Sequence, residues 1–312
     1  MTQSTPFFSI VIPSYNRSKL IQGTLDSVLA QTFTDFEVWI VDNCSTDDTA
    51  IVVDSFCQRD ARIQFVQNDQ NYDRSYSRNR GIELSRGQYI SLLDSDDFLL
   101  PSCLEDAYQF IQKNPDTKVL HFDYEMVDES KKVLSNSKKW PNYPTALQRI
   151  LIANYIGNIG FFVKNDILKE NLYDATRMLT GSEDWDFWIR LIHHVPDLKS
   201  LPKINAQVLQ HEGRTMNQYD GQKLNQRTDY IIEKHLAKAQ AIHFEKEFLS
   251  SCFILTGNGY QESNDAKLAW RFYKKAIGTR FITIFSYRAM ALLKNIIHKG
   301  FFNFFNKYLK KQ

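Results

Sequence analysis

The stretch Tyr89-Ile-Ser-Leu-Leu-Asp94-Ser95-Asp96-Asp97 runs from an apolar segment directly into three carboxylates. Its Ile and Leu side chains favour a buried strand, whereas crowded ionised carboxylates repel one another and need a counter-charge. A divalent cation satisfies both demands, because hard oxygen ligands hold such ions and the ion can carry a diphosphate. When the stretch is taken alone, a solvated acidic turn at a strand end explains it equally well.

The segments on either side of this stretch alternate between strand and helix patterns. Apolar, β-branched runs predict strands at residues 8–13, 36–41, 63–66, 89–93, 118–124, 158–163 and 203–209. Apolar residues at helical spacing predict helices at residues 17–30, 47–57, 77–84, 101–113 and 184–194, with Ser45 or Thr46 as the cap of the second. This alternation predicts an α/β fold whose parallel sheet is covered by helices on both faces.

Two of the predicted strands end in a carboxylate. Asp42 follows the strand at 36–41, and Asp94 follows the strand at 89–93. In open parallel sheets, ligands bind beyond the carboxyl ends of the strands. We therefore expect both carboxylates to face one crevice.

The remaining chain differs from this alternating pattern. Residues 131–156 are irregular, and we expect a long loop or an insert there. Residues 222–312 show hardly any strand pattern and predict several helices. We place a domain boundary near residue 215, between an α/β domain over 1–215 and a helical region over 216–312.

The composition is that of a soluble globular protein. The 312 residues are 43% hydrophobic and 24% charged, and the net charge of +2 does not indicate nucleic acid as a partner. No apolar run is long enough to span a bilayer without a charge, and the N-terminal residues lack the pattern of a signal peptide. The four cysteines have no Cys-x-x-Cys spacing, so we expect reduced thiols in a cytoplasmic protein.

Five blocks of sequence occur in the order seen in family 2 glycosyltransferases with the GT-A fold, and the chain resembles this family over about its first two thirds. The blocks are Phe8-Ser-Ile-Val-Ile-Pro-Ser-Tyr-Asn16, Val41-Asp-Asn-Cys-Ser-Thr-Asp47, Ser77-Arg-Asn-Arg-Gly81, Leu93-Asp-Ser-Asp-Asp97 and Ser182-Glu-Asp-Trp-Asp186. The resemblance implies a Rossmann-like GT-A catalytic domain over 1–215. It also implies the inverting transfer of a sugar from a nucleotide-diphosphate sugar, with UDP expected, to an acceptor hydroxyl in cell-surface polysaccharide or glycan synthesis.

The resemblance places the nucleotide beside the first two strands. Asp42 is implied to contact the base, although a cap of the following helix is the alternative. Pro13, Tyr15 and Arg17 lie in the loop beside the nucleotide, where ordinary turn chemistry explains them nearly as well. This chain departs from the family pattern at Asn43-Cys44, where many relatives carry Asp and Gly. The departure leaves open which base the nucleotide carries.

The resemblance also assigns the arginine and carboxylates of the third and fourth blocks. Arg78 is implied to hold a carboxylate or phosphate, whereas Arg74 and Arg80 are expected to be solvated. Many relatives carry Gly and Ala where this chain has Tyr72-Asp73-Arg74-Ser75-Tyr76, so donor recognition is expected to differ there. Asp96 is implied to coordinate Mg2+ or Mn2+, and Asp94 to bind the ribose or a metal-bound water, with Ser95 between them at the nucleotide.

Two further sites complete the expected active site. Glu183 and Asp184 open the helix at 184–194, where the helix dipole favours ionised carboxylates. The resemblance places the general base at Asp184, with Glu183 as the fallback, and acids that merely compensate the dipole are the alternative. His211 follows the last strand and either completes the metal site, touches the diphosphate, or is an ordinary loop histidine.

The C-terminal tail from Arg288 to Lys311 combines cations with interleaved Phe residues and has no acids. This composition suits an interfacial helix on anionic lipid at the inner face of the cell membrane. A helix packed on the catalytic domain or on a partner suits it equally well. The expected partners are thus a nucleotide-sugar donor, a glycan or lipid-linked acceptor, and a membrane or protein surface for the tail.

Two other functions compete with this interpretation. A sugar-phosphate nucleotidyltransferase would share the sheet and the metal, but the glycine-rich, arginine-bearing loop expected after its first strand is replaced by Pro13-Ser-Tyr-Asn16. A non-catalytic adaptor would use the helical region to bind a partner. The acidic residues present in three of the five blocks argue against an adaptor that has lost its active site.

Overall fold

The computed structural model describes residues 5–137, 143–211 and 220–297, which fall into two compact units. Among these residues, the first unit takes in 5–137, 154–177 and 183–211. The second unit takes in 143–153, 178–182 and 220–297. The domain boundary that we predict near residue 215 lies outside the described residues.

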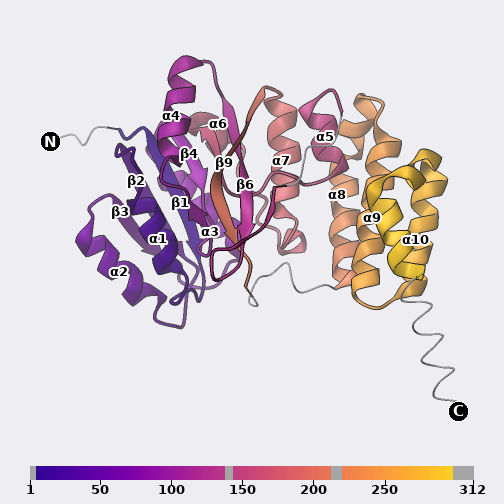
Figure 1. The fold of residues 1–312 in the computed structure, drawn as a ribbon, viewed down its shortest axis with the longest axis horizontal. Coiled ribbons are helices and arrows are strands. Elements are labelled where there is room, and N and C mark those ends of the chain that lie inside the picture. The colour runs from indigo at the N-terminus through magenta and orange to yellow at the C-terminus, as the bar shows by residue number, and fades with distance from the viewer. Residues whose placement is uncertain (1–4, 138–142, 212–219, 298–312) are drawn as a thin grey trace, which may run out of the picture. The chain divides into compact units, whose positions relative to one another are not determined.

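The described part of the first unit is built on a nine-stranded sheet in the order β3-β2-β1-β4-β8-β6-β9-β5, with β7 paired to β6 (Figure 1). The strands are β1 (Phe8–Ser14), β2 (Phe36–Asp42), β3 (Ile63–Gln67), β4 (Tyr89–Leu92), β5 (Phe98–Leu99), β6 (Val119–Val127), β7 (Val133–Asn136), β8 (Phe161–Lys164) and β9 (Leu198–Leu209). β1 to β4 run parallel, whereas β8 is antiparallel to both β4 and β6. The predicted α/β class is confirmed, and the sheet becomes mixed beyond β4.

Helices cover both faces of this sheet. They are α1 (Ile21–Leu29), α2 (Thr49–Arg59), α3 (Arg74–Leu84), α4 (Cys103–Lys113), α6 (Asn165–Glu170) and α7 (Glu183–His194). Ile10 and Ile12 of β1 join one apolar core with buried residues of α1, α2 and α4. Val11 points the other way, toward α3, where Gly81 leaves no room for a side chain: a Cβ there would lie 2.3 Å from Val11 Cγ1. The alternation of β1 therefore places helices on both faces.

Several predicted elements differ from the observed ones. Among the described residues of the region 131–156, where we expect a long loop or an insert, the strand β7 and the short helix α5 (Ala146–Ile152) form. Thr145 and Gln148 close a capping box on α5. The helix predicted from residue 17 begins at Ile21. The strand predicted at 158–163 begins at Phe161, after Gly160 with φ of +69°.

The predicted cap of the second helix is also wrong. α2 begins at Thr49, with Asp48 at the N-cap position and no side-chain cap bond. Ser45 instead donates its hydroxyl and its backbone N–H to Asp42. Ser45 therefore binds the carboxylate at the end of β2 instead of capping α2.

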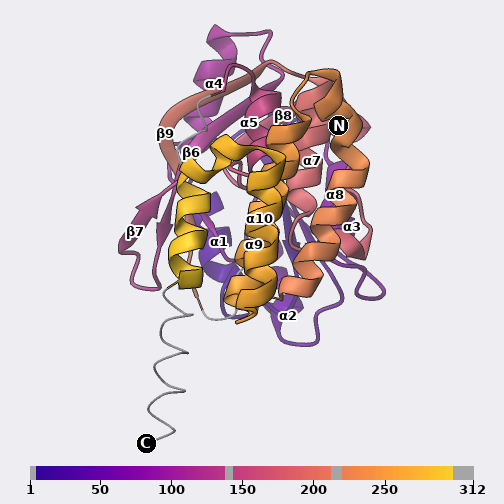
Figure 2. The same cartoon turned by 90° about the vertical axis from the view of Figure 1, so that its right-hand side faces the viewer.

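The second unit is helical, as predicted. Besides α5 it contains α8 (Gly221–Ala241), α9 (Glu245–Glu262), α10 (Ala266–Thr279) and the 3-10 helix η3 (Phe281–Phe285), and residues 287–297 are also helical. Another 3-10 helix, η1 (Arg177–Leu179), spans the division between the units. Figure 2 shows α9 beside both α8 and α10, and an apolar cluster that includes Phe253, Tyr273 and Leu292 joins these helices. None of the helices in the described ranges is both long enough and apolar enough to cross a bilayer.

Candidate active site

The carboxyl ends of β1, β2 and β4 meet at one edge of the sheet. Ser14 pairs with Asp42 across the β1–β2 ladder, and β4 runs parallel to β1. Because parallel strands end on the same side, the loops that follow them gather there. Asp42 and the acidic turn after β4 are therefore placed at a common edge, as the sequence predicts.

The turn after β4 brings three carboxylates together. Oxygens of Asp94, Asp96 and Asp97 all lie within 4.8 Å of one another. Asp96 Oδ2 lies 3.0 Å from His211 Nε2 and 3.5 Å from Arg17 Nη2. Asp97 Oδ1 accepts the backbone N–H of Leu209 at 3.0 Å, so this carboxylate ties the turn to the end of β9.

These residues fit a hard divalent cation. Asp94 and Asp96 offer carboxylate oxygens, their side chains are 30% and 10% exposed, and an imidazole stands beside Asp96. Oxygen ligands with one histidine suit Mg2+ or Mn2+ better than the thiophilic metals. Ser95 between them is buried.

Arg78 is the central cation of the site. It lies on α3, is 1% exposed, and donates to Asp94 Oδ1 at 2.8 Å and to Glu183 Oε1 at 3.0 Å. Burial by itself would lower the pKa of Arg78, but the charges of Asp94 and Glu183 outweigh it and raise that pKa. The guanidinium thus stays charged and joins the acidic turn to the start of α7.

Asp184 follows Glu183 in the first turn of α7, and it accepts the backbone N–H of Trp185 at 2.8 Å. Burial and, after it, the charge of Glu183 raise the pKa of Asp184 to about 6, against the opposing charge of Arg78. Trp188 and Ile189 on the same helix are fully buried, so α7 is held firmly in the core. A carboxylate with such a pKa is ionised at neutral pH and still accepts a proton readily.

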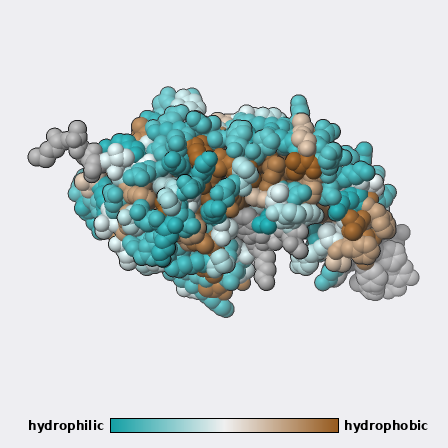
Figure 3. Space-filling view, turned by 90° about the horizontal axis from the view of Figure 1, so that it is seen from above, coloured by the Kyte–Doolittle hydropathy of each residue, from teal (hydrophilic) through white to brown (hydrophobic). Residues whose placement is uncertain are grey.

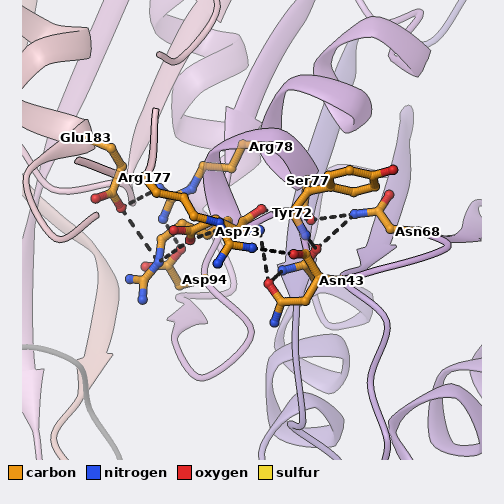
Figure 4. A network of polar contacts seen from close by, with 11 residues as sticks. Asn43, Asn68, Tyr72, Asp73, Ser77, Arg78, Asp94, Arg177 and Glu183 are labelled. Carbon is orange, nitrogen blue, oxygen red and sulfur yellow. Dashed lines mark hydrogen bonds and ion pairs between the residues drawn. The ribbon is translucent and has the colours of Figure 1, made fainter. Parts of the chain in front are cut away.

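A network of amides lines the loop between β3 and α3, and the sequence patterns did not indicate it. Asn43 Oδ1 accepts from Asn68 Nδ2 at 3.1 Å and from the backbone N–H of Tyr72 at 3.0 Å, while Asn43 Nδ2 donates to Asn71 at 3.0 Å. Asn68 also donates to Ser77 Oγ on α3 at 3.0 Å. Figure 4 shows this network beside Arg78, Asp94 and Glu183. The only sequence signal for this network was Asn43, a position at which the chain departs from the family pattern.

The turn into α3 carries backbone strain. Asp73 has φ of +86° and ψ of 165°, a region that residues other than glycine rarely occupy. Its N–H donates to Asn71 Oδ1 at 3.1 Å, and its carboxylate accepts the N–H of Arg74 as the cap of α3. Local hydrogen bonds therefore hold a conformation that glycine would adopt without strain.

Two arginines that we expected to be solvated are half-buried and make polar contacts. Arg74 Nε lies 3.8 Å from oxygens of both Asp73 and Glu183. Arg80 Nη1 donates to Asn68 Oδ1 at 2.6 Å and to the carbonyl of Gln67 at 2.9 Å. Both side chains are partly exposed to solvent, but they also contact residues near the end of β3 and the start of α7, which local sequence does not reveal.

The remaining predicted residues lie on β1, β2 and the loop after β1. Asp42 is fully buried, and it accepts from Ser45 and, at 2.9 Å, from Gln67 Nε2. Pro13 is buried in β1, whereas Tyr15 is 42% exposed. Arg17 reaches the acidic turn at Asp96, so the structure joins this loop to the candidate metal site.

The comparisons of this chain with known proteins agree with one another. Residues 9–168 match the family model described as glycosyl transferase family 2. The chain is 32% identical over 190 residues to an uncharacterized glycosyltransferase of Methanocaldococcus jannaschii, covering 60% of this chain and 65% of that protein. It is 31% identical over 222 residues to a chondroitin synthase of Escherichia coli, covering 70% of this chain but only 31% of that protein. The chain thus spans less than two thirds of the length of either relative.

Solved structures resemble the chain over a larger share of its length. The crystal structure of S. aureus TarS in complex with UDP-GlcNAc has a TM-score of 0.65 and 24% identity, covering 91% of this chain and 83% of that one. A mannosyltransferase from Pyrobaculum calidifontis in complex with GDP-Man and Mn2+ has a TM-score of 0.58 and 14% identity, covering 98% and 84%. At these identities the likeness establishes the fold alone, and that fold agrees with the predicted GT-A class.

Proposed function

The chain belongs to glycosyl transferase family 2, and on this premise we propose that it moves a sugar from a nucleotide-diphosphate sugar to an acceptor hydroxyl with inversion. One observation carries the proposal. Arg78 pairs with Asp94 in the acidic turn and with Glu183, the neighbour of Asp184. One buried cation therefore joins the turn that would hold the metal to the first turn of α7, which carries the proposed base.

The donor and acceptor classes are part of the proposal. TarS was crystallised with UDP-GlcNAc and the Pyrobaculum enzyme with GDP-Man, which supports a nucleotide sugar here, and we propose UDP as the nucleotide. Asp42, Pro13 near the end of β1, and Tyr15 and Arg17 in the loop after β1 would contact this nucleotide. The chondroitin synthase relative supports an acceptor in polysaccharide or glycan synthesis.

In the proposed mechanism, Asp184 removes the proton of the acceptor hydroxyl while that oxygen attacks the anomeric carbon. Burial and Glu183 keep the pKa of Asp184 at about 6, which suits a base at neutral pH. Arg78 holds Glu183 and Asp94 in place, and Arg17 adds positive charge beside Asp96. A bound Mn2+ or Mg2+, held by Asp94 and Asp96 with His211 beside them, would supply positive charge to the departing diphosphate.

The experiment is a donor hydrolysis assay with purified full-length protein, a panel of nucleotide sugars and Mn2+. We expect metal-dependent release of the nucleotide, and Asp96→Ala should abolish it by removing a ligand. Asp116→Ala, which removes an exposed carboxylate near the end of α4, is the matched control and should leave the rate unchanged. Equal rates for wild type and Asp96→Ala would remove this turn from the mechanism, and no turnover with any donor would favour an adaptor.

A further inference from the structure

The second unit presents an apolar surface to solvent. It consists of residues that are between 49% and 83% exposed: Phe281, Ile282, Phe285, Tyr287, Met290 and Ile297. We call it the C-terminal apolar surface. In Figure 3, brown and tan side chains gather at the right-hand end, over the C-terminal helices. Single exposed apolar residues are common, but a continuous group of this kind marks an interaction site.

The inner side of η3 explains why its rings point outward. Thr283 is buried and its hydroxyl lies 2.7 Å from Ser250 Oγ on α9. Just before η3, Arg280 Nη2 lies 3.1 Å from Glu247 Oε1, also on α9. These two contacts hold one side of η3 against α9 and leave Phe281, at 70% exposed, and Phe285, at 69% exposed, on the other side.

The helix at 287–297 continues the same surface. Ala289 and Leu292 are fully buried and belong to the core of the second unit. Tyr287, Met290 and Ile297 are exposed, and their spacing of three and seven residues places them on one face. A soluble helix normally presents polar residues on its outward face, so this apolar face calls for a partner.

The chain segment that carries this surface has charged residues of a single sign. Residues 266–297 contain no acid, and their cations are Lys267, Arg271, Lys274, Lys275, Arg280, Arg288 and Lys294. Arg280 pairs with Glu247, and Arg288 donates to the carbonyl of Ile152. The other five cations are exposed. The sequence has the same character up to residue 312, with four more cations and no acid.

Aromatic and aliphatic side chains flanked by lysine and arginine match the boundary of an anionic bilayer, where rings enter the acyl region and cations meet headgroups. A second copy of this chain fits less well. A symmetric dimer would place the same surface on both sides, and the exposed cations would face each other with no acid among residues 266–297 to offset them. We propose that the C-terminal apolar surface docks this protein on anionic lipid membranes, independently of its proposed activity.

The test uses the full chain in vesicle co-sedimentation. One set of vesicles contains phosphatidylcholine alone and the other contains phosphatidylglycerol as well. The double variant Phe281→Ser, Phe285→Ser removes two rings whose exposure means that the fold does not depend on them. Ile51→Ser on α2 is the matched control, because Ile51 is also 70% exposed. Circular dichroism and donor hydrolysis verify that each variant is folded.

We expect the wild type and Ile51→Ser to sediment with the phosphatidylglycerol vesicles, less so at high salt. The double variant should bind about tenfold more weakly or worse, since two rings no longer enter the bilayer. Wild-type binding by the double variant, or no binding by the wild type, would overturn the proposal. The proposal would also be overturned if the wild type formed an oligomer and the double variant did not, because the surface would then be a protein interface.

Discussion

At the scale of single residues, the site depends on one guanidinium that pairs with two carboxylates from distant parts of the chain. Arg78 is 1% exposed, and Glu183 is 3% exposed. Removing one partner of a buried ion pair leaves an uncompensated charge in the interior, which costs more than the pair contributes. Arg78 is therefore expected to matter for folding as well as for catalysis.

We predict that Arg78→Met lowers the free energy of unfolding by about 3–5 kcal/mol, because Asp94 and Glu183 lose their shared cation. Urea unfolding followed by circular dichroism measures the change. Arg62→Met is the control, since Arg62 is 30% exposed beside Asp60 and its pair should contribute about 1 kcal/mol or less. If both variants lost the same small amount, the buried bridge would have no special role in stability.

Asp184 is the residue on which the chemical step is proposed to depend. We predict that Asp184→Asn lowers kcat by about 10²–10⁴-fold, because the amide cannot accept the acceptor's proton. Donor affinity, measured by calorimetry, should stay near the wild-type value. Asp116→Asn serves as the control. An Asp184→Asn enzyme with full turnover would rule out this residue as the base.

The raised pKa of Asp184 also predicts the pH dependence of the rate. The base must be ionised, so kcat should rise as the pH increases through about 6 and level off above it. Below this pKa the protonated fraction grows, and the rate should fall about tenfold per pH unit. Initial rates between about pH 4.5 and 8 measure this limb. A flat profile over the same range would contradict the assignment.

At the scale of elements, the position of Arg78 depends on how closely α3 approaches the sheet. Gly81 is one turn after Arg78, and a Cβ at Gly81 would meet Val11 Cγ1 at 2.3 Å and Val41 Cγ2 at 3.2 Å. Only glycine lets the helix approach this near. A bulkier residue must push α3, and Arg78 with it, away from β1.

We predict that Gly81→Ala lowers the free energy of unfolding by about 1–3 kcal/mol through overpacking. Gly278→Ala in α10 is the matched control, because nothing lies within 4 Å of its Cβ position and alanine should stabilise the helix by up to about 1 kcal/mol. Thermal unfolding of both variants measures the difference. Opposite signs are expected, and a stabilised Gly81→Ala would show that α3 has room to move.

At the scale of the whole chain, sequence patterns identified the α/β class, the strands β1 to β4, the helical character of the second unit and the acidic residues of the site. These features can be predicted because they depend on local sequence: the periodicity of apolar residues and the placement of carboxylates after apolar runs. Trp188 and Ile189, for example, lie in the helix predicted at 184–194 from its apolar spacing, and both are fully buried. The proposed roles of the site residues stay predictions.

Tertiary structure alone decided which groups meet. The antiparallel insertion of β8 between β4 and β6, the contact of Arg78 with Glu183 and the asparagine network around Asn43 all join segments that are far apart in sequence. The same holds for exposure: Phe281 and Phe285 are large apolar residues, yet they face solvent because Thr283 takes the inward position. Local sequence sets the secondary structure and the burial that each segment favours. The groups that the segment then contacts depend on the packing of the complete fold.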